Sequence, residues 1–551
     1  MHDALKFYDK EDRPWPSNRL TSSAIVGHTS AKAARIWFRA WTPGDYCLVL
    51  SREPIEVDRQ PAVEEDLSAA FTRASNGRKR RLGERVEVLR DVGYGTDITG
   101  VFDVRDLEPG TRYHYAVFAL DEDRSERWEI GRDHAHSFRT AAPDAESVRF
   151  GLFSCHMPFK GRDVRNMHMW QSFRQVLEIY DADFVVAGGD QVYTDGDDGM
   201  NIWRWLRKKK SEVARLSKAD QIDVMLSWYR DIYRGYWGDL ELRRVFRGWP
   251  TYMIWDDHEI MDGWGSYTRT ELSNTLDSLW EWENKKKNVA LAYNMFEAAK
   301  QAYFEYQHSH NPKTPAGQWD YSFRWNQCAF FVMDMRGQRS YRRKQYRILG
   351  QTQFRRLAAW LKSPKVRAAK VLFLVSPVPV IHLKDFVTNH LDLTLLGLAD
   401  DLRDEWEHES NLKERDQLLD LVFKLSEQEG KRIVFLSGDV HISAAFKLTR
   451  ESTPGAEVYQ LTSSGITYCK APGKALALAA KKNGELKLFK PKRGQRKGPR
   501  TFFRRLDLFV ENNFGLVTVG GAEDPGRVAW DLYGASDDEN EIVRRRRVVL
   551  D

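Results

Sequence analysis

Four short apolar runs in the middle of the chain each end in residues that can bind metal ions. The runs are residues 148–153, 184–187, 251–255 and 432–436, and they are followed by Ser154-Cys155-His156, Gly188-Gly189-Asp190, Asp256-Asp257-His258-Glu259 and Ser437-Gly438-Asp439-Val440-His441. Folds that alternate strands and helices place their sites in loops beyond the carboxyl ends of the strands. We therefore expect these polar residues to meet at one edge of a sheet.

The spacing between the runs predicts an α/β layered core from residue 147 onward. A fifth strand is expected at residues 371–375, and strand-like runs such as 514–519 return over about 445–551. Helices are expected at residues 165–180, 219–236, 285–306, 351–362 and 411–429.

The first 143 residues are predicted to form a separate β-rich domain. Apolar and polar positions alternate at residues 34–40, 46–50 and 113–118, with turn residues between them. A linker at residues 140–145 separates this domain from a catalytic domain over residues 146–551. A chain of 551 residues is too long for one ordinary core, which agrees with two domains.

Composition excludes several classes of protein. The 85 Lys and Arg residues against 79 Asp and Glu give a net charge of +6, too slight over this length to indicate a nucleic-acid binder. The 19 Trp, 21 Tyr and 28 Phe residues indicate large cores and cleft walls, with base stacking as the alternative. The four cysteines, Cys47, Cys155, Cys328 and Cys469, lie too far apart in the chain to suggest a disulfide framework or a structural zinc site.

No run approaches the ~20 apolar residues that a membrane span needs. The N-terminus has neither a twin-Arg pair nor an apolar signal segment, so the chain as written is expected in the cytoplasm. It would be periplasmic or secreted if a leader is missing from this sequence.

Each polar cluster alone has an ordinary explanation. Cys155 could be a small buried apolar residue, and the Gly-Asp-x-x-Tyr run from Gly189 to Tyr193 could form an Asx turn. The run from Asp256 to Glu259 has no Lys mixed into it, which favours function over a solvated surface. Together the clusters form an oxygen-rich set with two imidazoles and at most one thiolate. This set favours a two-metal hydrolytic site, with cations about 3.5–4 Å apart.

The order of these motifs resembles the calcineurin-like metallophosphatase superfamily, and their details resemble its alkaline phosphatase D family. That family's marks are a Ser-Cys after the first strand, Gly-Asp-x-x-Tyr, Trp-Asp-Asp-His-Glu and a late Ser-Gly-Asp-x-His, and all four are present from Ser154 to His441. The resemblance covers about residues 20–530. It implies a four-layer α/β/β/α sandwich, preceded by a fibronectin-III-like β-sandwich. Residues 107–113, Leu-Glu-Pro-Gly-Thr-Arg-Tyr, resemble a corner of such sandwiches.

The resemblance also implies a role for each site residue. Cys155, Asp190, Tyr193 and His441 would bind Fe(III), with Asp190 shared between the metals. Asp257 and Asp439 would bind a second divalent cation, calcium in this family, with Zn, Mn or Mg as alternatives. His258 would protonate or stabilise the leaving oxygen. Arg336 would clamp the phosphate, with a buried ion pair to Asp334 as the equal alternative.

Two departures from the family pattern are present. The family has an Asn shortly after Asp-Asp-His-Glu, and Asp262 takes that place here. An added carboxylate could tighten the second metal site or change its selectivity. Family members also carry an export leader, which puts the natural substrate in doubt.

The sequence therefore predicts a metal-dependent phosphoesterase that uses a metal-bound hydroxide on small phosphorylated monoesters or diesters. No membrane span and no obligate protein partner are expected. The alternatives are a non-catalytic phosphate-ligand binder that keeps the fold, and a nucleic-acid binder that uses residues 481–505 with Phe489, Phe502 and Phe503. The basic residues of 481–505 could also be a solvated loop or a rim that attracts phosphorylated substrates. Residues 196–250 are expected to cover the cleft, and Arg544–Arg547 to lie on an edge strand.

Overall fold

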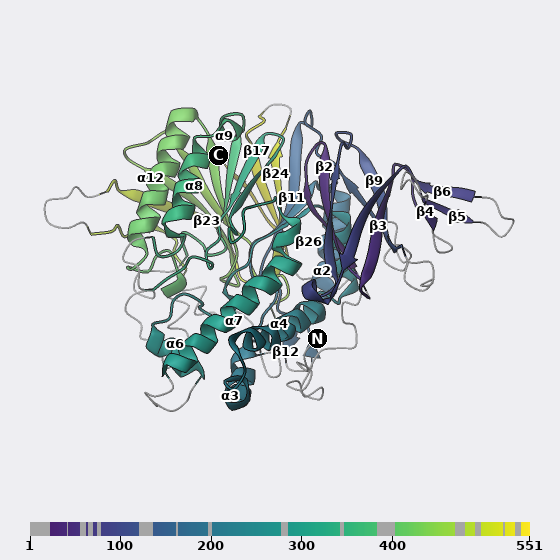
Figure 1. Ribbon diagram of the computed structural model, residues 1–551. Coiled ribbons are helices and arrows are strands. Elements are labelled where there is room, and N and C mark those ends of the chain that lie inside the picture. Colours follow the sequence, from purple (N-terminus) through teal and green to yellow (C-terminus); the bar gives the residue numbers. More distant parts are fainter. Residues whose placement is uncertain are drawn as a thin grey trace.

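The computed structural model shows two central sheets flanked by helices, with a separate group of strands on one side (Figure 1). The residues that it describes are 23–40, 42–55, 62–63, 70–73, 79–120, 136–160, 163–196, 201–276, 285–341, 346–382, 403–468, 480–490, 498–521, 524–534 and 541–550.

The first central sheet has six strands, and its three parallel strands lie at one end. The order is β15 (Thr251–Met253), β14 (Phe184–Ala187), β11 (Ser147–Phe153), β24 (Asn513–Gly520), β25 (Val528–Gly534) and β26 (Val543–Leu550). Strands β11, β14 and β15 are parallel, and β24 joins them in the antiparallel sense. The predicted strand around residues 514–519 therefore completes the sheet that the predicted strands 148–153, 184–187 and 251–255 begin.

The second central sheet has eight strands, and its middle is parallel. The order is β16 (Tyr321–Trp325), β17 (Cys328–Val332), β18 (Val371–Val375), β19 (Arg432–Ser437), β21 (Glu457–Thr462), β20 (Ser443–Arg450), β23 (Thr501–Phe509) and β22 (Asn483–Glu485). Strands β17, β18, β19 and β21 run parallel. A short pair, β12 (Phe159–Lys160) and β13 (Asp163–Val164), lies outside both sheets.

The two sheets pack against each other through aromatic side chains. Phe150 of β11 stacks on Phe184 at 5.0 Å between ring centroids and meets Phe330 and Phe373 of the second sheet edge-on at 5.5 and 5.2 Å. In β18, Val371, Phe373 and Val375 face this shared core, whereas Leu372 and Leu374 belong to a second core. Strands buried on both faces read as continuous apolar runs, which explains the sequence pattern.

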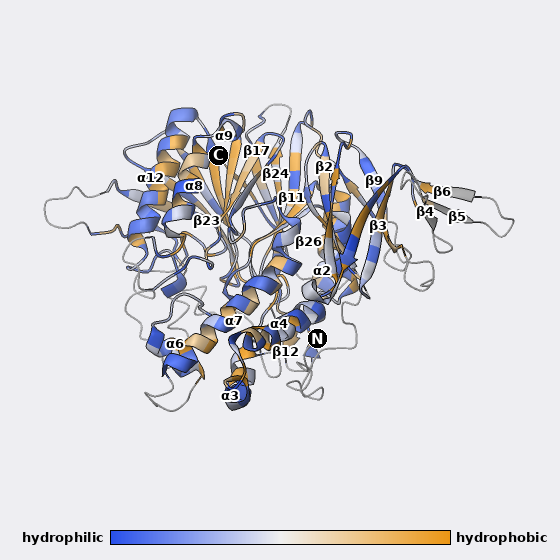
Figure 2. Ribbon diagram, viewed as in Figure 1, coloured by the Kyte–Doolittle hydropathy of each residue, from blue (hydrophilic) through white to orange (hydrophobic). Residues whose placement is uncertain are grey.

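The helices cover the outer faces of the sheets and one end of the molecule. Helices α8 (Gly350–Leu361), α9 (Pro364–Arg367) and α12 (Leu412–Glu429) complete the second core, and their apolar sides face the sheet (Figures 1 and 2). Helix α2 (His168–Ile179) packs on β11 and β24. The others are α3 (Ile202–Val213), α4 (Lys218–Tyr236), α5 (Leu240–Gly248), α6 (Arg269–Leu276) and α7 (Lys285–Tyr306), with the 3₁₀ turns η3 (Tyr94–Thr96), η5 (Asp257–Glu259) and η6 (His308–His310).

The N-terminal strands form two facing sheets. One contains β1 (Ser23–Thr29), β2 (Ala33–Arg39) and β8 (Thr99–Arg105), and the other β10 (His136–Arg139), β9 (Arg112–Ala119), β3 (Gly44–Ser51) and β7 (Arg85–Val92). Alternate residues of both sheets share one core, and the hydroxyl of Tyr113 accepts the N–H of Glu108 at 3.0 Å. A small sheet of β4 (Ala62–Val63), β5 (Ala70–Arg73) and β6 (Lys79–Gly83) extends away from them (Figure 1).

A buried network of charges joins these strands to the helices. Asp97, next to β8, pairs with Arg39 at 3.1 Å and with Arg234 of α4 at 2.6 Å, and it also accepts the hydroxyl of Tyr306. The indole of Trp37 donates to the carbonyl of Glu305 at 2.7 Å. The N-terminal strands are thus held on α4 and α7 by specific polar contacts as well as by apolar packing.

The predicted strands and helices are confirmed, and several elements were missed. Strands β16 and β17 and helices α3, α5, α6 and α9 were not predicted. Residues 544–547 do lie on an edge strand, β26. The basic stretch is in part ordered sheet, because β22 and the start of β23 lie within it.

The aromatic residues are largely core, as predicted. Trp37, Trp170, Trp237 and Trp255 are among the largest fully buried side chains, and Phe503 is also buried, so it cannot stack on a base. Cys47, Cys155 and Cys328 are free and buried, whereas Cys469 lies outside the described residues. In the part of the chain that the structure describes, no helix is long and apolar enough to cross a bilayer.

Asp97→Asn is expected to destabilise the protein by about 3 kcal/mol, because it removes the one carboxylate that two buried guanidinium groups, Arg39 and Arg234, share. Although burial opposes its charged form, Arg234 and Arg39 lower the pKa of Asp97. The Asp97 contribution is therefore present above the unfolded pKa of about 4 and is lost as the pH falls through the lower folded pKa. Denaturant unfolding at several pH values measures both effects.

The matched control is Asp103→Asn. Asp103 pairs with Arg35 and Lys313, but its side chain is 35% exposed, so the change should cost less than about 1 kcal/mol. Equal costs for the two variants would contradict the assignment.

Candidate metal centre

The loops that follow β11, β14 and β19 hold four non-glycine residues in the left-handed backbone region. The φ angles are 54° for Cys155, 59° for Asp190, 66° for Asp439 and 55° for His441. Such conformations cost free energy for residues with a Cβ and cluster at functional sites. All four were predicted metal ligands, and their backbones turn sharply at the carboxyl ends of neighbouring strands.

Two glycines allow these loops to approach one another. A Cβ on Gly438 would overlap the side chain of Ser154, and one on Gly189, at φ 105°, would lie 2.8 Å from the Cβ of Asp256. The Gly-Asp pairs are therefore required by packing between loops as well as by the turns themselves.

Glu259 ties the loops together with a buried carboxylate. It accepts the backbone N–H groups of Gln191 at 2.8 Å, Asp256 at 2.9 Å and Asp190 at 3.1 Å, and the amide of Gln307 at 2.9 Å. Burial raises the pKa of Glu259 to about 8. Its four acceptor contacts fix the position of the Asp190 loop relative to Asp256.

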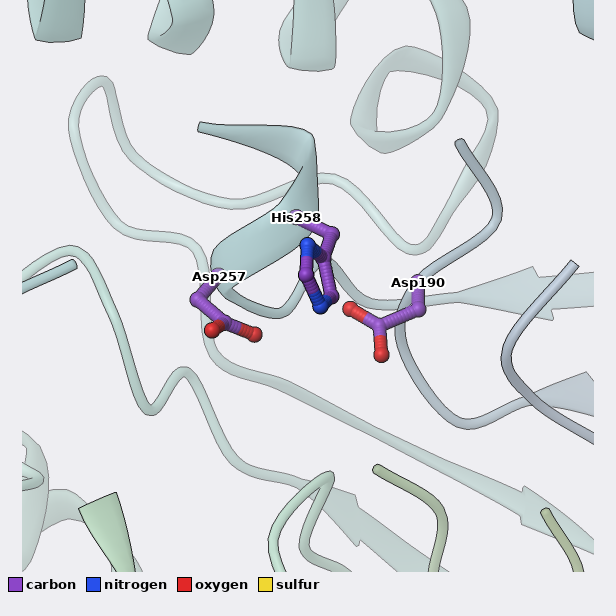
Figure 3. A group of neighbouring side chains, drawn as sticks. All are labelled: Asp190, Asp257 and His258. Carbon is purple, nitrogen blue, oxygen red and sulfur yellow. The ribbon is translucent and has the colours of Figure 1, made fainter. Parts of the chain in front are cut away.

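Four carboxylates converge at the centre. Oxygen atoms of Asp190, Asp256, Asp257 and Asp439 all lie within 4.8 Å of one another, and Asp190, Asp257 and His258 form an overlapping group by the same measure. The three side chains of the second group point toward one another, with the imidazole between the two carboxylates (Figure 3). The structure thus brings together predicted residues from three separate strands.

A thiol and a phenol lie next to Asp190. Cys155 Sγ is 3.3 Å from Asp190 Oδ2, and the hydroxyl of Tyr193 is 3.4 Å from the same oxygen. The thiol of Cys155 and the hydroxyl of Tyr193 therefore meet at one oxygen of Asp190, so these three predicted iron ligands lie together.

His441 lies next to this group and outside the carboxylate groups of the described residues. Its backbone N–H donates to the hydroxyl of Ser464 at 2.8 Å, and that hydroxyl is 3.2 Å from Cys155 Sγ. The imidazole stacks on Tyr468 with 3.5 Å between ring centroids. The structure places His441 at the Cys155 side of the centre, with its role as a ligand still a prediction.

His258 is held by a carboxylate that the sequence analysis did not single out. Its Nδ1 is 2.7 Å from Asp195 Oδ1, and the other oxygen of Asp195 accepts the backbone N–H of Asp262. The ring of Tyr193 stacks on the imidazole at 4.0 Å. Asp262 groups with Asp195 and His258, rather than with the four converging carboxylates.

Arg336 is fully buried among carboxylates. Its guanidinium pairs with Asp256, with Asp404 at 2.7 Å and with Asp257 at 3.3 Å. The alternative prediction for Arg336, an ion pair with Asp334, is wrong. Asp334 accepts the backbone N–H of Arg336 and the indole N–H of Trp255 instead.

The protein environment disfavours ionisation of most of these groups. Burial and the neighbouring carboxylates raise the pKa of Asp190 and of Asp439 well above the usual value. Burial and the Asp190 carboxylate do the same to the pKa of the Cys155 thiol and the Tyr193 phenol. Asp257 differs, because Arg336 and His258 outweigh its burial and lower its pKa.

These residues fit a pair of bound cations. Oδ1 of Asp190 and Oδ2 of Asp256 are buried without a hydrogen-bond partner among the described residues. Unpaired buried acceptors at the meeting point of four carboxylates are costly without positive charge. The donor set also combines a thiol and a phenol, both next to Asp190 Oδ2, with further carboxylates, and this mixture of donor types suits two different metals.

The comparisons with known proteins agree with this geometry. Residues 150–497 match a family model described as PhoD-like phosphatase. The chain belongs to the PhoD-like phosphatase family. The predicted resemblance to alkaline phosphatase D is therefore confirmed, and the matched region is of the phosphatase type.

Two similar proteins are a solved structure and a curated yeast protein. A solved structure described as that of PhoD is similar with a TM-score of 0.61 and 15% identity, covering 97% of this chain and 91% of that one. The uncharacterized protein YGR266W of Saccharomyces cerevisiae is 23% identical over 350 residues, or 52% of this chain. The chain spans 47% of the length of that curated relative.

Sequence reasoning missed four carboxylates of this PhoD-like site. Asp195 lies just after the Gly-Asp-x-x-Tyr motif and Asp256 inside Trp-Asp-Asp-His-Glu, and their acidic character was the available signal. Glu259 was counted as one more acidic residue, although its contacts are structural. Asp404 lies between Arg336 and Ser437, outside every motif, and nothing in the sequence marks it.

Gly438→Ala should disrupt the PhoD-like site, because the added methyl group would overlap Ser154. We expect a loss of about 2 kcal/mol or more in the free energy of unfolding, together with weaker metal binding. Chemical denaturation and metal analysis measure the two effects.

Gly188→Ala is the matched control in the neighbouring loop. Its Cβ would lie 3.6 Å from the carbonyl oxygen of Phe153, an ordinary contact. If both variants behave alike, the close approach of the loops is not the reason for glycine at position 438.

Proposed function

We propose that this protein is a metal-dependent phosphoesterase that hydrolyses small phosphorylated monoesters or diesters. The observation that supports it most is the convergence of Asp190, Asp257 and His258 on one point, with the thiol of Cys155 and the hydroxyl of Tyr193 next to Asp190 Oδ2. Family membership supports phosphate ester hydrolysis as the reaction.

We propose that Cys155, Asp190, Tyr193 and His441 hold Fe(III), because a thiolate and a phenolate stabilise that oxidation state. Asp257 and Asp439, together with Asp256, would hold a second divalent cation, of which Ca²⁺ is our first candidate and Zn, Mn or Mg the alternatives. Such a pair of cations supplies an activated water and neutralises charge on phosphoryl oxygens.

His258 is proposed as the group that delivers a proton to the leaving oxygen. Burial opposes its charged form, but Asp195, Asp257 and Asp190 outweigh it and raise the pKa of His258 well above the usual value. Asp195 receives Nδ1–H and leaves Nε2 directed toward the centre, so Asp195 is a positioning residue. Proton delivery of this kind accounts for about 10²–10⁴-fold in rate.

Arg336 is better explained as a positioning residue than as a phosphate clamp. Its three ion pairs hold it against Asp256, Asp257 and Asp404. Its Nη2 has no hydrogen-bond partner among the described residues, but the side chain is fully buried and three carboxylates already share its charge.

The finer architecture also belongs to this proposal. The two packed sheets with helices outside them support a four-layer α/β/β/α arrangement over residues 146–551. The two facing N-terminal sheets and the Tyr113 contact support a fibronectin-like domain over residues 1–143. Helices α3 to α5 occupy residues 202–248, the segment that we expect to cover the cleft.

The non-catalytic alternative is disfavoured because all six predicted ligand positions and His258 are intact. The nucleic-acid alternative loses one of its three aromatic residues, since Phe503 is buried. A steep fall of nucleic-acid affinity with salt would revive it.

Asp190→Asn should remove bound metal and lower hydrolysis of bis-p-nitrophenyl phosphate and p-nitrophenyl phosphate on the order of 10³-fold. Elemental analysis and steady-state rates measure both effects. Asp183→Asn is the matched control, since Asp183 is half-buried next to the opposite end of β14 and accepts the N–H of Arg149. It should keep metal and activity. A wild type without metal, and inactive after loading with iron and calcium, would make the binder hypothesis the better one.

Asp195→Asn should lower kcat about 10²-fold or more while metal content stays at the wild-type level. The loss should be larger for phenyl phosphate than for p-nitrophenyl phosphate, because the poorer leaving group depends more on protonation. Combining it with His258→Gln should add little further loss, since the two residues act as a unit. An equal loss on both substrates would argue against proton delivery by this pair.

A further inference from the structure

The segment before α12, residues 403–411, passes beside the metal centre with a tightly held backbone. The side-chain amide of Asn411 donates to the carbonyl of Glu405 at 2.8 Å and to that of Arg403 at 3.0 Å. The N–H of His408 donates to the same Glu405 carbonyl at 3.1 Å. The position of Glu405 is therefore fixed by its backbone.

The residue before Glu405 is tied directly to the centre. Asp404 pairs with Arg336 at 2.7 Å and with Arg339 at 3.1 Å, and Arg336 in turn pairs with Asp256 and Asp257. Two ion pairs thus separate Asp404 from the converging carboxylates.

Both carboxylate oxygens of Glu407, two residues after Glu405, have polar partners. One of its oxygens pairs with Lys481 at 2.6 Å, and the other accepts the N–H of His382 at 2.6 Å. Between these two residues, Trp406 donates its indole N–H to Ser376 at 3.2 Å. The neighbours of Glu405 therefore all have defined polar partners.

The carboxylate of Glu405 differs from them. Glu405 is 4% exposed, and its Oε2 is buried without a hydrogen-bond partner among the described residues. Burial disfavours the charge of Glu405, and the carboxylates of Asp439, Glu407 and Asp404 add to that effect, whereas Arg339 opposes it. A buried carboxylate oxygen without a partner, among other carboxylates, costs several kcal/mol unless a cation compensates it.

We infer that Glu405 supplies a further carboxylate to a hard divalent cation held beside Asp439. The inference rests on the proposed function and extends its second metal site. An all-oxygen environment with several carboxylates suits Ca²⁺, which takes six to eight oxygen ligands. Glu405 would then make this site more anionic and tighter for calcium.

The test is Glu405→Gln in the full-length chain, with CaCl₂ titrated into metal-free and iron-loaded protein by calorimetry. Glutamine keeps the size of the side chain and removes its charge. We expect the affinity for Ca²⁺ to fall about 10–100-fold, while the iron content after loading equals that of wild type. Glu405→Asp keeps the charge on a shorter side chain. Its affinity for Ca²⁺ should lie between those of wild type and Glu405→Gln.

The matched control is Glu407→Gln, which changes a buried carboxylate of the same segment. It should leave Ca²⁺ affinity unchanged and lower the melting temperature of the metal-free protein, because it leaves Lys481 without its ion pair. Glu405→Gln should not lower that melting temperature, and it should reduce the rise in melting temperature that Ca²⁺ produces in wild type.

Unchanged Ca²⁺ affinity in Glu405→Gln, with normal iron loading, would overturn this inference and leave the proposed function intact. A lower melting temperature of the metal-free variant, with a full response to Ca²⁺, would also overturn it by assigning Glu405 a structural role. A wild type that binds neither iron nor Ca²⁺ would overturn the proposed function and this inference together.

Discussion

The crowding of buried carboxylates is the constraint on which the rest of this structure depends. Asp190, Asp256, Asp257 and Asp439 bring their oxygens within 4.8 Å of one another in a site that largely excludes water. Like charges at such distances repel strongly where the dielectric is low. The four carboxylates need positive charge between them to offset this repulsion. The oxygens of Asp190 and Asp256 that have no hydrogen-bond partner among the described residues are where a cation would bind.

The chain supplies part of the compensation itself. Arg336 is placed so that it contacts two of the four carboxylates and is anchored from behind by Asp404. Glu259 turns three backbone N–H groups toward itself and thereby holds the loops that carry Asp190 and Asp256. Arg336 and Glu259 thus hold the carboxylates in place, and bound cations would neutralise the negative charge that Arg336 does not.

The two central sheets hold the strained backbone of the site in place. Left-handed residues at Cys155, Asp190, Asp439 and His441 are tolerated because the strands before them are buried on both faces and packed through Phe150, Phe330 and Phe373. The N-terminal strands add support from the side, through Asp97 and its two arginines, to the helices α4 and α7. Rigid elements therefore position every ligand loop.

What the sequence by itself determined is local: apolar strands of known length, each ending in a turn with Asp, His or Cys, in an order that identified the family. These signals depend on neighbours along the chain, so residues such as Asp190, Asp257 and His258 could be predicted in advance as candidates, and the structure places these three together. The roles of Asp195, Arg336, Asp404 and Glu405 were decided only by the tertiary structure, because each depends on partners far away in the sequence. Whether a buried carboxylate meets an arginine, a backbone N–H or nothing at all is set by the packing of loops, and no local pattern records it.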